Sequence, residues 1–122
     1  VAWSMQLNGD QLLQVFEALA NPHRLRIISA LHQNRKYVSE LAREVELSRP
    51  LLYMHLKRLE VAGLVAGSLE LSNDGKAMKY YALQDFAFQI SPSLIAEAVK
   101  TLSDQDVSKK KGSEIEANEE ED

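Results

Sequence analysis

The sequence predicts a mainly α-helical fold with a small β-hairpin, an α+β class. Apolar residues recur every three or four positions along residues 10–62, which is typical of helices with one buried face. The pattern becomes strand-like over residues 64–83, where SNDG supplies residues that tolerate the conformations of hairpin loops. A final stretch with helical spacing covers residues 91–102.

Length and composition favour a single small domain. The chain has 122 residues, 45% of them hydrophobic, which is enough for one core. It shows no membrane-spanning run and no signal-peptide pattern, so a cytoplasmic location is expected. The absence of cysteine excludes disulfides and thiolate metal sites.

The net charge of −4 is unevenly distributed. From Ser103 onward there are eight acidic and three basic residues, whereas the rest of the chain has 10 acidic and 11 basic residues. We therefore expect an N-terminal extension over 1–9, a folded domain over 10–103 and a disordered acidic tail over 104–122. The tail could compete with a negatively charged partner for a basic face of the domain, or it could simply increase solubility.

Two helices are predicted before residue 34. The first covers residues 10–20. The second begins after Asn21, because asparagine is a favourable N-cap and proline at position 22 suits the first helical turn. Its buried stripe is expected to consist of Leu25, Ile28 and Leu31.

Two short helices joined by a tight turn come next. Tyr37 and Val38 are expected to form a short strand or bridge, and Ser39 to cap the helix ELAREVE. After a turn at Glu46, a second helix covers 49–62 and ends near Gly63. This pair followed by a hairpin describes a winged helix-turn-helix.

The outer face of helix 49–62 carries side chains suited to DNA. Leucines 52, 56 and 59 share the inner face, and Arg49, Pro50, Tyr53, Met54 and Lys57 lie opposite. The arginine can contact a guanine, and the apolar pair a thymine methyl. The start of the helix stays open, because Pro50 disfavours helical geometry in the residue before it. Either Ser48 caps the helix, or Arg49 lies outside it.

The hairpin adds two basic side chains near its turn. They could meet phosphates or the minor groove, or form an ordinary solvated edge. An ordinary solvated face is likewise the alternative for the helix, but the neighbouring turn and hairpin favour DNA. The predicted DNA-contacting residues are Ser39, Ser48, Arg49, Pro50, Tyr53, Met54, Lys57, Arg58, Lys76 and Lys79.

Three stretches, VFEALANPHRLRIISAL, SELAREVELSRPLLYMHLKRLEVAGLV and DGKAMKYYAL, resemble the ArsR/SmtB class of transcriptional regulators. The resemblance runs from Leu12 to Leu83. It implies a homodimer paired through its first and last helices, and a repressor that binds a palindromic operator. A winged helix of about 70 residues does not need both of those helices for its own core. The predicted interface residues are Leu12, Phe16, Leu94, Ile95, Val99 and Leu102.

The chain departs from the family where members bind metals. The segment SELAREV contains no cysteine, and the last helix offers Glu97 and Asp104 but no histidine. His55 has no acidic residue or histidine three or four positions away, so we interpret it as a hydrogen-bonded histidine at the core edge or near DNA. No metal or cofactor is predicted. Glu46 stands where a turn glycine would be usual, at a cost of about 1 kcal/mol.

Other functional classes have less support. No Ser/His/Asp or Cys/His set and no phosphate-binding glycine loop occurs, so no catalytic residue is predicted and the protein is not expected to be an enzyme. The main alternative is a winged-helix protein-interaction module that does not bind DNA.

Overall fold

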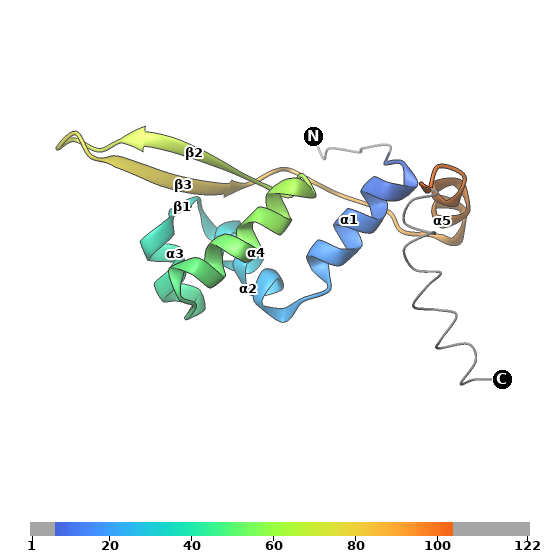
Figure 1. The fold of residues 1–122 in the computed structure, drawn as a ribbon, viewed down its shortest axis with the longest axis horizontal. Coiled ribbons are helices and arrows are strands. Elements are labelled where there is room, and N and C mark those ends of the chain that lie inside the picture. Colours follow the sequence, from blue (N-terminus) through green and yellow to red (C-terminus); the bar gives the residue numbers. More distant parts are fainter. Residues whose placement is uncertain (1–6, 104–122) are drawn as a thin grey trace. The chain divides into compact units, whose positions relative to one another are not determined.

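The computed structural model describes residues 7–103 and has the mainly helical architecture with a hairpin that the sequence predicts (Figure 1). The predicted acidic tail and most of the predicted N-terminal extension lie outside the described residues. The elements in chain order are α1 (Gly9–Leu19), α2 (Pro22–Gln33), β1 (Lys36–Tyr37), α3 (Val38–Val45), α4 (Arg49–Val61), β2 (Val65–Leu71), β3 (Ala77–Leu83) and α5 (Pro92–Val99).

The chain forms two compact units. The first, residues 13–88, contains the helix-turn-helix and the hairpin. In Figure 1, α2, α3 and α4 lie on one side of the hairpin, and the turn between β2 and β3 extends past them. The second unit combines residues 7–12 with residues 89–103, including α5. No helix within residues 7–103 is long and apolar enough to cross a membrane.

The sheet has three antiparallel strands in the order β1-β3-β2. Strands β2 and β3 pair from Val65↔Leu83 to Leu71↔Ala77, which confirms the predicted hairpin. The turn is closed by the N–H of Ser72, which donates to the carbonyl of Lys76 at 2.8 Å. Gly75 has a φ of +84°, a conformation that glycine adopts without strain.

Helices α3 and α4 contribute four fully buried leucines to the core of the first unit. They are Leu41, Leu52, Leu56 and Leu59. The predicted stripe on α2 is confirmed for Leu31, which is buried, but it is wrong for Leu25 and Ile28, because the other buried residues are Ile27 and Ala30. Leu25 is 53% exposed. A step of three residues falls about 60° short of a full helical turn, so a stripe that repeats every three residues drifts away from the core.

The start of α3 also differs from the prediction. The N-cap is Tyr37, without a side-chain hydrogen bond, and Ser39 lies inside the helix. The helix begins at Val38, which is buried. Burying a valine contributes about 1.5–3 kcal/mol, more than the roughly 1 kcal/mol of a serine cap, so packing decides where this helix starts.

The helix-turn-helix is closed by a left-handed residue and a serine cap. Glu46 has φ 57° and ψ 45°, as expected for the turn where glycine is usual. Ser48 is the N-cap of α4, and its Oγ accepts the N–H of Leu51 at 3.4 Å. The open question about Pro50 is thereby settled, because Arg49 is the first helical residue. The helix is followed by Gly63 with a φ of +79°, which confirms the predicted stop.

The second unit is held by contacts between its two segments. The N–H of Gly9 donates to Oγ1 of Thr101 at 2.7 Å, and that of Ser103 to Oδ1 of Asp10 at 2.9 Å. A Cβ on Gly9 would lie 2.2 Å from the carbonyl oxygen of Ala98, so only glycine fits there. The last helix ends at Val99 rather than at residue 102, and its final turn tightens to bonds between residues three apart.

Candidate nucleic-acid interface

Helix α4 presents the two faces that the sequence predicts. Its leucines at 52, 56 and 59 are fully buried. On the opposite side, Tyr53 is 44% and Met54 52% exposed, and the side chains of Arg49, Pro50 and Lys57 are exposed as well. The buried leucines hold the helix against the core, and the polar and apolar side chains on its opposite side remain accessible to a partner.

A hydrogen-bond cluster ties α4 to the neighbouring helices. His55 is 5% exposed, and its Nδ1 lies 3.0 Å from Nη1 of Arg24. The guanidinium also donates to the carbonyls of Ala18, at 2.7 Å, and Glu17, at 2.9 Å. Because arginine only donates, Nδ1 accepts and the imidazole is neutral. His55 is therefore a hydrogen-bonded histidine at the core edge, as interpreted from the sequence.

The surroundings of His55 oppose its protonation. Burial is the largest cause that lowers its pKa below 6.5, followed by the positive charges of Arg24 and His23. The ring of His23 lies 5.4 Å from that of His55. Arg24 is itself desolvated and faces the charge of Arg58, and both effects lower its pKa. The positive charges of Arg24 and Arg58 therefore lie close enough to interact at α4.

Four residues predicted to contact DNA come together between the helices and the wing, which is the hairpin formed by β2 and β3. A hollow of about 320 Å³, here called the wing hollow, brings together Ser39 of α3, Arg49 and Tyr53 of α4, and Lys79 of β3. Its remaining lining residues are Tyr37, Val38, Leu69, Ala77 and Met78. The four polar residues supply two hydroxyls and two cations, the donor types that hold phosphates. None of the ion pairs found within residues 7–103 involves either cation.

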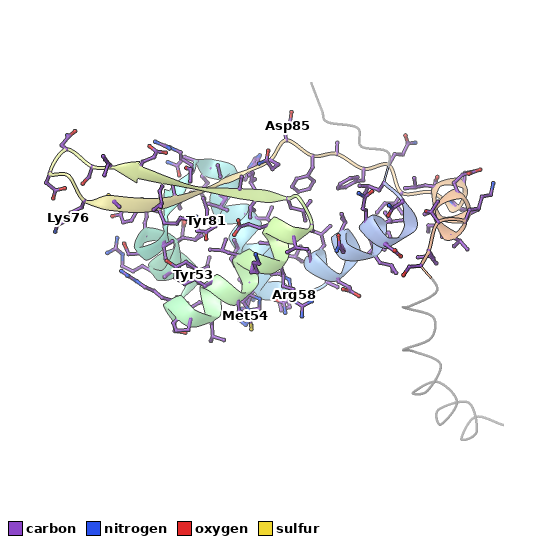
Figure 2. All side chains as sticks on the ribbon, turned by 45° about the horizontal axis from the view of Figure 1, so that its top comes forward. Tyr53, Met54, Arg58, Lys76, Tyr81 and Asp85 are labelled. Carbon is purple, nitrogen blue, oxygen red and sulfur yellow. The ribbon has the colours of Figure 1, made fainter. Side chains whose placement is uncertain are left out.

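A second hollow lies on the other side of α4. It has a volume of about 430 Å³ and is lined by residues of α1 and by Met54, Lys57, Arg58 and Val61 of α4. Figure 2 shows Tyr53 on the side of α4 toward the hairpin, and Met54 and Arg58 on the other side. The predicted contact residues of this helix therefore form two groups rather than one continuous surface.

The wing carries the remaining predicted contacts. Lys76 lies exposed at its turn, where Figure 2 labels it. The two tyrosines of β3 are neighbours in a strand and therefore point to opposite faces, and Tyr81 is 3% exposed whereas Tyr80 is half-buried. The guanidinium of Arg35 lies 4.4 Å from the ring centre of Tyr80 and forms an ion pair with Glu70. Because Glu70 and Leu69 are neighbours in β2, this ion pair lies on the face of the hairpin opposite Leu69.

Sequence reasoning overlooked part of this surface. Tyr37 and Met78 line the wing hollow, and Leu69 and Leu71 are the most exposed large apolar residues among residues 7–103. Their alternation with Ser68 and Glu70 was visible in the sequence and places both leucines on one face of β2. The two residues at the hollow gave no comparable signal.

The predicted interface residues differ in accessibility. Ile95 is 44% and Val99 56% exposed. Leu94, Leu102 and Phe16 are half-buried, and Leu12 is 4% exposed, within the chain's own core. Within residues 7–103, no three or more histidine, aspartate or glutamate side chains gather closely enough to hold a metal ion.

Comparisons with known proteins agree with this geometry. The model of the family described as "Bacterial regulatory protein, arsR family" matches residues 21–66. The uncharacterized HTH-type transcriptional regulator MJ0229 of Methanocaldococcus jannaschii is 40% identical over 84 residues, covering 69% of this chain and 87% of that protein. The HTH-type transcriptional repressor SmtB of Mycobacterium tuberculosis is 37% identical over 58 residues, which are 48% of this chain and 43% of the repressor.

A solved structure supports the same assignment. The winged helix-turn-helix domain of Mb0332 from Mycobacterium bovis, described as homodimeric, DNA-binding and possibly of the ArsR family, superimposes with a TM-score of 0.55 at 30% identity. The match covers 61% of this chain and 64% of that one. Together with the exposed face of α4 and the wing beside it, these likenesses show that the chain belongs to the ArsR family of DNA-binding transcriptional regulators.

Proposed function

We propose that the protein is a homodimeric, sequence-specific repressor that binds a palindromic operator in the cytoplasm. Residues 10–103 would act together in DNA binding and dimerisation. The observation that carries the proposal is the wing hollow, where α3, α4 and β3 each contribute a phosphate-binding type of side chain. Two cations that share a hollow without an acidic partner repel each other, and an ordinary solvated surface does not explain such an arrangement.

The faces of α4 suggest how the bases are read. Pro50, Met54 and Lys57 follow one another at spacings of four and three, so they form one stripe along the exposed side. We assign this stripe to the major groove, with apolar contacts to thymine methyl groups near the N-terminus of the helix. Arg49 shares the wing hollow with Ser39 and Lys79, which favours a backbone phosphate over a guanine for this residue.

The other predicted contacts surround this stripe. Oγ of Ser48 accepts the N–H of Leu51, which leaves the hydroxyl proton free to donate to a phosphate. Lys76 at the wing turn can reach the backbone or minor groove beside the half-site. Arg58 lies one residue beyond Lys57 and adds charge at the far end of the helix.

Self-association is supported by exposed apolar side chains on α5. Ile95 and Val99 are four residues apart, so they share a helix face, and both remain substantially exposed. We propose that they form the centre of the dimer contact. The other residues proposed for this contact are Leu12, Leu94 and Leu102 of the same unit, and Phe16 of the first unit. A two-fold dimer presents two recognition helices, which would explain a palindromic operator.

DNA binding is tested by selecting genomic fragments with the full chain and titrating the enriched duplex at several salt concentrations. Arg49→Ala and Lys79→Ala should each weaken binding and reduce the salt slope by roughly 0.9, as expected for one lost phosphate contact. Arg26→Ala serves as the control, because this arginine is exposed on α2 outside both hollows near α4. If no fragment is enriched, the proposal fails and the protein-interaction alternative gains support.

The dimer is tested by the mass of the protein in solution. Ile95→Asp with Val99→Asp should convert a dimer to a monomer, because two charges would be buried without partners at the contact. Leu25→Asp is the matched control, since that leucine is 53% exposed on α2. A wild-type monomer, or a dimer that survives the double substitution, would contradict the proposed interface.

A further inference from the structure

The wing has an apolar edge that the proposed phosphate contacts do not explain. Leu69 is 69% and Leu71 77% exposed. They lie two residues apart in β2 and therefore point to the same face. The register pairs Leu69 with Lys79 and Leu71 with Ala77, so these four side chains share one face of the hairpin.

This leucine face is continuous with the wing hollow. Leu69, Ala77 and Lys79 all line that hollow together with Ser39 and Arg49. The leucine face thus extends the proposed phosphate-binding surface toward the hairpin turn.

The same face is closely packed nearer the helices. A Cβ on Gly67 would lie 2.8 Å from Cε of Lys79 and 2.9 Å from Cε1 of Tyr81, so glycine lets both side chains lie over the strand.

The opposite face of the wing is already occupied. Arg35 pairs there with Glu70 and covers the ring of Tyr80, which packs edge-on against Tyr37 at 5.9 Å between ring centres. The two faces therefore differ in kind. On the face of Glu70, the charge of Arg35 is neutralised by an ion pair within the protein. The leucine face combines exposed leucines with cations that lack an acidic partner in residues 7–103.

We propose that Leu69 and Leu71 enter the DNA minor groove beside the half-site that α4 reads. This inference rests on the proposed function. The minor groove is about 6 Å wide, which admits a leucine side chain between two walls of phosphates. Lys79 beside the leucines and Lys76 at the turn are positively charged and therefore complement the negative phosphates on the two sides of the groove. Apolar side chains are common minor-groove wedges in architectural DNA-binding proteins.

The proposal implies a sequence preference at the flank. A·T pairs offer only acceptors in the minor groove, whereas G·C adds the amino group of guanine. A leucine against that amino group would remove its water without replacing the hydrogen bond. The base pairs that flank the half-site, under the wing, should therefore favour A·T. This preference would arise although no side chain of the leucine face forms a hydrogen bond with those bases.

The test uses the duplex enriched from genomic fragments and the variant Leu69→Ser with Leu71→Ser. Affinity should fall roughly tenfold or more, since apolar contacts are lost, while the salt slope stays that of wild type because no phosphate contact is removed. Leu25→Ser is the matched control, and thermal melting checks the fold. Both wing leucines are more than two-thirds exposed, so their replacement should leave the melting temperature unchanged.

A second arm changes only the DNA. Replacing flank A·T pairs by G·C should weaken wild-type binding, and replacing those guanines by inosine, which lacks the amino group, should restore it. The double variant should not distinguish the three duplexes.

Unchanged affinity of the double variant, a reduced salt slope, or failure of inosine to restore binding would overturn the inference. A wild type that binds no duplex would instead overturn the proposed function itself.

Discussion

Replacing Glu46 by glycine should stabilise the protein. Glu46 has φ 57°, and no other non-glycine residue between positions 7 and 103 has a positive φ. Its N–H lies 3.3 Å from the carbonyl of Arg43, so the left-handed geometry closes α3 before the turn into α4. The side chain is exposed, and none of the ion pairs among the described residues involves it. Truncation to glycine therefore removes backbone strain and little else.

The magnitude follows from two opposing terms. A left-handed conformation costs a non-glycine residue about 1–2 kcal/mol. Glycine loses roughly 0.4–1 kcal/mol more chain entropy on folding. The difference is a gain on the order of 0.5–1 kcal/mol in the free energy of unfolding. With a urea m-value of about 1–3 kcal/mol/M, the midpoint should rise by a few tenths of a molar.

Two further variants make the measurement decisive. Glu46→Ala removes the side chain but keeps the strain, so its stability should stay close to wild type. Gly63→Ala imposes the same strain where φ is +79° and nothing lies within 4 Å of a new Cβ, so it should lose roughly 1 kcal/mol. If Glu46→Gly proves neutral or destabilising while Gly63→Ala is destabilised, backbone strain at Glu46 is refuted.

Three further predictions concern α2 and its neighbours. Arg24→Met should lower the free energy of unfolding by roughly 2 kcal/mol, because two carbonyls and an imidazole lose their donor; an unchanged urea midpoint would contradict this. Since the pKa of His55 is lowered on folding, the unfolded state binds more protons below pH 6.5, so stability should be constant above that pH and fall below it. His55→Gln should flatten this pH dependence in urea titrations, whereas the exposed control His32→Gln should retain it. Asn21→Ala removes the acceptor for two N–H groups and should cost about 1 kcal/mol, visible as a lower melting temperature.

The elements that the sequence predicted well have strong local signals. The hairpin follows from SNDG between two alternating runs, and its turn glycine indeed has a positive φ. The faces of α4 follow from leucines at 52, 56 and 59, whose spacing keeps them on one side. In α2, by contrast, the spacing predicted a stripe of which only Leu31 is buried, and the core uses Ile27 and Ala30 instead. Local periodicity alone could not choose between the two stripes.

The candidate site was predictable by residue type but not by grouping. The cations and hydroxyls were recognised one at a time, yet only tertiary structure shows that Ser39 and Lys79 share a hollow, whereas Arg58 belongs to another. The bond between Arg24 and His55 joins residues 31 apart, and no local pattern signals it. Such pairings depend on how the helices pack, which a single sequence does not specify position by position.

The arrangement separates the side chains proposed to bind DNA from those that hold them in place. Arg49 is exposed, while three fully buried leucines anchor its helix. Lys79 differs, because its ammonium lies 5.7 Å from the ring centre of the buried Tyr81 and its stem covers Gly67. Substitution of Arg49 should therefore report binding alone, whereas substitution of Lys79 also changes packing at the base of the wing. A loss of affinity in Lys79→Ala can be assigned to a phosphate contact only if the salt slope falls with it, because lost packing releases no counterions.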